Sequence, residues 1–253
     1  MLRYFKMRDD LLAPVPAKDV YVKRPHGRGW PEECPPIRAA NSFGFDLLAN
    51  FDVTFRQNSD GTWSADPDIE ISSDFDYSPS DDSEGVPLVQ RYAWFWDRGQ
   101  TVPHTITDDV FDAIKHQVKL STFLFLQTDP NEVLLLQDPP ATTTDADRGW
   151  RAMPALIETD WYTPANPWHV VLELNASLST VSLKKGQPIC RVIPVRRDTY
   201  FAQQMTVGEF DTMFERSQKW LSTHGKQTDE TGVLDITRTY VRQQARSKFI
   251  ILE

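Results

Sequence analysis

The chain has 253 residues, 40% of them hydrophobic and only two of them cysteine, so it can bury a core without disulfides, which argues against a disulfide-built secreted scaffold. A formal net charge of -9 opposes binding to extended nucleic acids and to anionic membranes. No stretch is apolar enough for a signal peptide or a membrane span, and we therefore expect a cytoplasmic protein.

The first 40 residues are rich in proline and basic side chains, which predicts an extended, irregular arm over residues 1–40. Residues 42–70 alternate apolar and polar side chains around a turn at residues 58–61, a pattern typical of a β-meander. The acidic stretch 72–85 lacks the regular carboxylate spacing of a calcium loop, so we interpret it as a solvated loop.

The middle of the chain begins with an aromatic run at residues 92–96, which suits a buried strand or a ligand shelf, core packing being the commoner role. A short helix is expected at 107–117, and apolar strands at 120–127 and 133–137. The loop 138–149 has no periodicity, and loops of this length in a compact domain often carry function.

The β pattern then returns, which predicts strands at 155–161, 168–174, 180–183 and 189–195. Together with the earlier strands they define a mainly β domain over residues 41–200, built as a barrel or sandwich.

The C-terminal part is predicted to be helical. Thr206 and Glu209 form a capping box that starts an amphipathic helix, which we expect to dock on the β domain over residues 206–225. Residues 226–253 form a tail with an apolar tip, which suits either pairing with a second subunit in a homo-oligomer or docking on its own domain.

Most catalytic signatures are absent, including the P-loop, the dinucleotide-binding glycine motif, the hydrolase elbow and the zincin helix. The five histidines lack a spacing that would aim two of them at one metal, so we predict no metal ligands and leave any cofactor unknown. A metal site assembled from distant residues, as in a β-barrel oxygenase, stays open as an alternative.

The most informative segment carries two carboxylates. Glu158 and Asp160 would lie on one face of a strand, where mutual repulsion would raise the pKa of at least one of them and produce a general base. The alternative is that both belong to the polar outer face of a half-exposed strand.

Short segments at 156–161, 170–175 and 183–189 resemble the distal half of the β-clip fold shared by trimeric dUTPases and dCTP deaminases. That resemblance implies that Glu158 orients a catalytic water and that Trp161 packs on a sugar. The segment 44–47 is similar to the Gly-Tyr-Asp-Leu strand of the same fold, which implies a substrate contact for Asp46. The Arg-Ser-Ser phosphate motif of these enzymes is missing, because the corresponding stretch 138–144 reads Asp-Pro-Pro-Ala-Thr-Thr-Thr.

A second resemblance is closer. The Ala-Asn-Ser-x-Gly strand at 40–44, the Pro-Pro loop at 139–140, the Glu-Thr-Asp-Trp strand at 158–161 and the Gly-x-Pro strand at 186–188 are similar to a bacterial family of unknown function. This family implies no activity.

These patterns lead to a hypothesis of a β domain that binds a small polar, nucleotide-like molecule and acts on it as an enzyme. Glu158 or Asp160 would be the base, His104 an acid, and Arg148 the partner of an anionic substrate group. The alternatives are a structural or ligand-binding subunit without catalysis, and the metal-dependent oxygenase.

Overall fold

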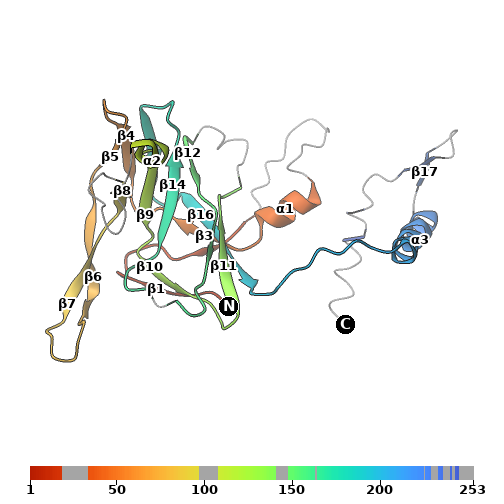
Figure 1. Cartoon of the computed structure of the whole chain (residues 1–253), viewed down its shortest axis with the longest axis horizontal. Coiled ribbons are helices and arrows are strands. Elements are labelled where there is room, and N and C mark those ends of the chain that lie inside the picture. Colours follow the sequence, from red (N-terminus) through yellow and green to blue (C-terminus); the bar gives the residue numbers. More distant parts are fainter. Residues whose placement is uncertain are drawn as a thin grey trace. The chain divides into compact units, whose positions relative to one another are not determined.

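The computed structural model describes residues 1–18, 34–96, 108–140, 148–162, 164–224, 226–228, 233–235, 240 and 243–244. The chain divides into two compact units, one of residues 1–24 and 39–198 and the other of residues 25–38 and 199–253. Strands dominate the first unit, and the main element of the second is one long helix (Figure 1). The prediction of a mainly β fold with a C-terminal helix is confirmed.

The largest sheet has five antiparallel strands in the order β13-β11-β16-β3-β2. Their bounds are Ala155–Ile157, Glu132–Gln137, Pro188–Arg196, Phe45–Leu48 and Val15–Pro16. Strand β16 lies at the centre of this sheet, and its residues 189–193 are accordingly buried on both faces.

A second antiparallel sheet has the order β12-β14-β9-β8, with the bounds Trp150–Ala152, His169–Leu174, Gln117–Ser121 and Ala93–Phe95. The register places Trp94 opposite Lys119 and Lys119 opposite Val171. The neighbouring row, Ala93, Leu120 and Val170, is buried. Because successive side chains point to opposite faces, Trp94, Lys119 and Val171 lie on the outer face of this sheet.

Smaller sheets complete the first unit. Strands β15 (Thr180–Leu183), β4 (Val53–Gln57) and β5 (Trp63–Asp66) form one, and β1 (Arg3–Lys6) pairs with β10 (Leu124–Gln127). Strands β6 (Glu70–Tyr77) and β7 (Val86–Arg91) form a hairpin that extends beyond the other strands of this unit (Figure 1). None of the sheets closes into a barrel within the described part of the chain.

Three helices are described: α1 (Pro35–Asn41), α2 (Asp108–Ile114) and α3 (Val207–His224). The capping box of α3 is confirmed, because Glu209 accepts hydrogen bonds from the backbone N–H and the hydroxyl of Thr206 at 2.7 and 2.8 Å. On this helix the rings of Phe210 and Phe214 stack with centroids 5.6 Å apart. The second unit also contains the strand pair β17 (Lys226–Thr228) and β18 (Val233–Asp235). The docking of α3 on the β domain stays a prediction.

The core of the first unit is apolar and aromatic. Phe123 is fully buried and stacks on Tyr92 with ring centroids 5.8 Å apart. Its φ of 55° lies in the left-handed region, which a bulky residue rarely adopts. This residue separates β9 from β10, so the single strand predicted at 120–127 is divided between two sheets. Both cysteines are free, and burial raises the pKa of the Cys190 thiol far above its usual range.

Three expected boundaries differ from the structure. Part of the arm 1–40 is regular, because β1 and β2 pair with β10 and β3. The first half of the acidic stretch is the strand β6, in which Ile71 and Phe75 pack on the core while the acidic side chains alternate with them. The strand predicted at 155–161 ends at Ile157, since the following residues turn away.

Candidate functional site

The two carboxylates of the predicted site share one cation. Arg197 Nη1 donates to Glu158 at 2.6 Å, and its Nη2 donates to Asp160 at 2.8 Å. The guanidinium of Arg197 lowers the pKa of Asp160 below its usual range. The upward pKa shift that mutual repulsion was expected to cause is therefore reversed at Asp160, since a positive charge lies between the two acids.

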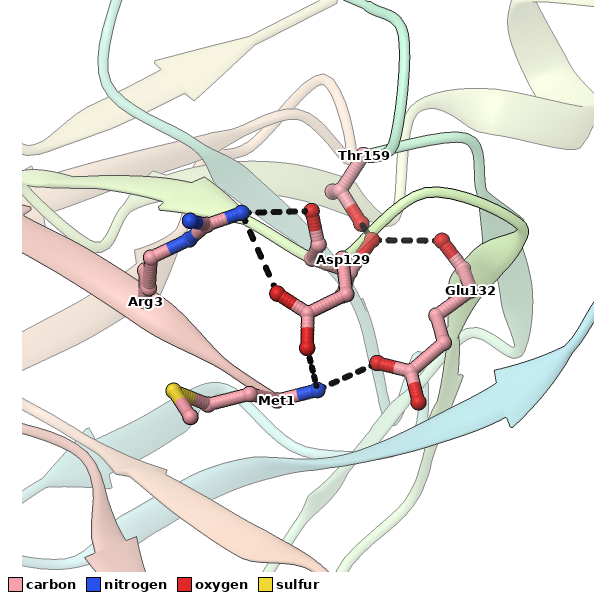
Figure 2. A network of polar contacts seen from close by, with 6 residues as sticks. Met1, Arg3, Asp129, Glu132 and Thr159 are labelled. Atoms are coloured by element: carbon pink, nitrogen blue, oxygen red, sulfur yellow. Dashed lines mark hydrogen bonds and ion pairs between the residues drawn. The ribbon is translucent and has the colours of Figure 1, made fainter.

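The residue before Asp160 lies in an anchored region of the fold. Thr159 is buried, and its hydroxyl lies 2.8 Å from that of Thr128. Beside it, the amino group of Met1 contacts Asp129 and Glu132, and Arg3 pairs with Asp129 at 3.2 Å (Figure 2). This network pins β1 to the turn between β10 and β11, so the region around Thr159 is an anchored corner of the fold.

Trp161, the predicted sugar platform, is 64% exposed. Its ring meets that of Tyr162 edge-on with centroids 6.1 Å apart. The indole is thus an open surface, and it does not line any of the hollows described below.

Asp46 and Arg191 form a buried ion pair between β3 and β16. Arg191 donates to both oxygens of Asp46, at 2.8 and 3.1 Å, and to the carbonyl of Asn41 at 2.8 Å. The side chains are 11% and 4% exposed. Asp46 is thereby fully engaged within the protein, which explains its burial without a ligand.

Arg148 is also engaged. Its guanidinium pairs with Asp138, donates from Nε to the carbonyl of Trp150 at 2.8 Å, and lies 4.4 Å from the ring centroid of Trp150. It lines a hollow of about 470 Å³ together with Arg151, which pairs with Glu173. Both arginines of this hollow are therefore already neutralised by carboxylates.

The predicted acid His104 lies outside the described residues, as does His26. Within the described ranges, no group of three or more His, Cys, Asp and Glu side chains is arranged to hold a metal ion. No helix in that part of the chain is long and apolar enough to cross a membrane.

A different hollow brings together residues that the sequence left scattered. We name it the Trp94 hollow; its volume is about 480 Å³, and it is lined by Val89, Gln90, Trp94, Phe95, Trp96, Lys119, Asn166, His169 and Val171. Its floor is the outer face of the four-stranded sheet, where Trp94, Lys119 and Val171 form one row. The wall includes Gln90 from the end of β7.

His169 and Gln90 form the polar corner of the Trp94 hollow. The Gln90 amide, only 5% exposed, donates to His169 Nε2 at 2.8 Å, so the neutral ring is assigned its proton on Nδ1. Burial, with a smaller effect from Lys119, lowers the pKa of His169 to about 4. His169 is therefore a neutral hydrogen-bonding group at physiological pH.

Lys119 supplies the positive charge. Its ammonium lies 4.1 Å from the ring centroid of Trp96, a cation–π contact. Among the described residues, no carboxylate lies within ion-pair distance of it. The indole nitrogen of Trp96 is buried and has no hydrogen-bond partner in the described part of the chain. The hollow thus offers aromatic surfaces and a cation that no carboxylate of the described residues neutralises.

One feature of the sequence had indicated the Trp94 hollow. The aromatic run at 92–96 raised the possibility of a ligand shelf, and Trp94 and Trp96 are on that shelf. Lys119, Gln90 and His169 gave no signal, because they come from three strands that are distant in sequence and carry no motif.

The fold and the hollow define a mainly β protein with a small-molecule-sized pocket on the outer face of a sheet. No protein-family model matches the chain, and no curated protein matches it in sequence.

Among solved structures, the chain is similar to a native dUTPase of EIAV, with a TM-score of 0.33 and 13% identity over 82% of this chain and 98% of that chain. It is similar to a mutant dUTPase of Staphylococcus bacteriophage 80alpha, with a TM-score of 0.36 and 9% identity over 81% of this chain and 96% of that chain. A mutant dUTPase from phage phi11 of S. aureus gives the same four values. No residue role follows from likenesses at TM-scores of this size.

Proposed function

We propose that this chain binds a small, planar, anionic molecule in the Trp94 hollow. The observation that carries the proposal is the Lys119 ammonium, which lies 4.1 Å from the Trp96 ring centroid in a recess of about 480 Å³ and pairs with no carboxylate of the described residues. Recesses of this size hold small ligands, and a few convergent polar groups among apolar walls fix the orientation of the ligand.

The chemistry of the lining selects the ligand class. Trp94 and Trp96 offer flat surfaces on which a planar ring stacks. Lys119 attracts a carboxylate or a phosphate, and the neutral His169 with Gln90 adds hydrogen bonds without a second charge. Aromatic carboxylates and nucleotide-like molecules share these features, in keeping with the polar, nucleotide-like substrate expected from the sequence.

Binding is the part of the earlier hypothesis that this geometry favours. Glu158 and Asp160 are held by Arg197 and do not line the Trp94 hollow. Catalysis by Glu158, Asp160 and His104 stays a prediction, as do substrate contacts of Trp161, Arg148 and Asp46. A role as a homo-oligomeric structural subunit also stays an alternative.

The test is isothermal titration calorimetry with 2-naphthoate and its neutral analogue 2-naphthamide. We expect Lys119→Met to weaken naphthoate binding about tenfold, since a hydrogen bond to a charged group contributes about 1.5 kcal/mol, and to leave naphthamide binding nearly unchanged. The matched control is Lys184→Met, because Lys184 is exposed and outside the hollow. Naphthoate binding that is absent, or that is equal in the Lys119 variant and the wild type, would refute the proposal.

A further inference from the structure

A second hollow adjoins the Trp94 hollow. Its volume is about 430 Å³, and its polar lining includes Ser64, Asp68 and Arg91. Trp94 and Phe95 line both hollows. Trp94 and Phe95 therefore lie where the two hollows meet.

The indole of Trp94 is held in place. Trp94 Nε1 donates to the carbonyl of Arg91 at 3.1 Å, which sets the orientation of the indole. The residue is nevertheless 41% exposed, so a planar ligand can reach the ring. The guanidinium of Arg91 lies 5.8 Å from the centroid of that ring.

Arg91 forms only a weak ion pair with Asp68. The distance from Arg91 Nη2 to Asp68 is 3.5 Å, and the two side chains are 46% and 59% exposed. Solvent screens such a pair, so it holds Arg91 weakly and a competing anion can replace Asp68. One recess consequently contains Lys119, which has no carboxylate partner in the described part of the chain, and the other contains the exchangeable cation Arg91.

We infer that the two recesses form one site for a planar dianion, with its body on Trp94, one anionic group at Lys119 and the second at Arg91 in place of Asp68. This inference rests on the proposed function, because it assumes that the first anionic group binds at Lys119. It adds that the ligand carries two separated negative charges. It also assigns Asp68 as an internal competitor of the second charge for binding to Arg91.

The experiment compares 2-naphthoate with 2,6-naphthalenedicarboxylate by calorimetry, because the two compounds differ in one carboxylate at the far end of the ring. We expect the dicarboxylate to bind the wild type about fivefold more tightly, the equivalent of about 1 kcal/mol. Asp68→Asn should increase this ratio severalfold, since Arg91 then has no competitor. Arg91→Gln should reduce the ratio to about one, because the second carboxylate then has no cation to bind.

The matched controls are Asp66→Asn and Arg56→Gln. These residues form a similarly exposed ion pair at 3.3 Å between β4 and β5, and neither lines the two hollows. They correct for the general effect of net charge on anion binding. If Asp66→Asn increases the ratio as much as Asp68→Asn does, the inference is overturned.

The outcomes separate the two proposals. Naphthoate binding that depends on Lys119, with no gain for the dicarboxylate or a gain that survives in Arg91→Gln, overturns the dianion site alone. The absence of naphthoate binding overturns the proposed function and the inference together.

Discussion

Acidification should destabilise the folded chain through His169. In the folded protein its pKa is about 4, because the ring is buried beside Lys119, whereas a histidine in an unfolded chain has a pKa of about 6.5. Between these values the unfolded chain binds a proton that the folded chain does not. The free energy of unfolding therefore falls as the pH decreases from about 6.5 toward about 4.

The size of the effect follows from the two pKa values. Each pH unit in that window lowers the free energy of unfolding by about 1.4 kcal/mol, so about 3 kcal/mol is lost across it. This is a large share of the stability of a typical domain. Carboxylates also titrate at the acid end of the window, so the contribution of His169 has to be measured as a difference between variants.

The assay is urea denaturation of the wild type and of His169→Gln between pH 7.5 and pH 4.5. Glutamine keeps a hydrogen-bonding group beside Gln90 but does not titrate, so the variant should lose less stability than the wild type over this range. An NMR titration of the wild-type imidazole should show no protonation near pH 6.5. Parallel stability profiles, or a His169 pKa near 6.5, would refute the reasoning.

Three further predictions concern the scaffold. Asp46→Asn should lower the free energy of unfolding by about 3 to 5 kcal/mol in urea denaturation, because Arg191 stays buried without its charged partner. A loss smaller than the one caused by breaking an exposed ion pair would contradict this. Gly149→Ala should lower the melting temperature more than Gly186→Ala, since both residues have a positive φ but only at Gly149 would the new Cβ lie 2.7 Å from a side chain; equal losses would argue against this steric effect. Thr206→Ala should destabilise α3 by about 1 kcal/mol, seen as earlier loss of helical circular dichroism on heating, and an unchanged profile would show that the cap contributes nothing.

Local patterns in the sequence predicted most of the strands. The segments 133–137, 168–174, 180–183 and 189–195 agree with β11, β14, β15 and β16 to within about one residue at each end. In these segments apolar residues decide burial directly. The break at Phe123 was not predictable, because a buried aromatic residue with a positive φ depends on the packing of Tyr92 and Phe51 around it.

The interactions in the candidate site were harder to predict from the sequence than the strands, because they join residues that are far apart in the chain. The electrostatics of Glu158 and Asp160 depend on Arg197, almost 40 residues downstream, which β16 brings beside them. The polar lining of the Trp94 hollow depends in the same way on the pairing of β9 with β14, which places Lys119 near His169. Side-chain spacing along one strand could not reveal either partnership.

The β6–β7 hairpin has a consequence for the behaviour of the protein in solution. Within the described ranges neither strand pairs with a third strand, so much of the hairpin edge is open to other chains, although the backbone N–H of Asp74 donates to the carbonyl of Met7 at 3.0 Å. Exposed edges of this kind promote aggregation unless charges or prolines block them. Asp74, Asp76 and Glu84 line the hairpin and its loop, and Pro87 interrupts the edge of β7. We therefore expect the acidic stretch to oppose edge-to-edge association in concentrated protein.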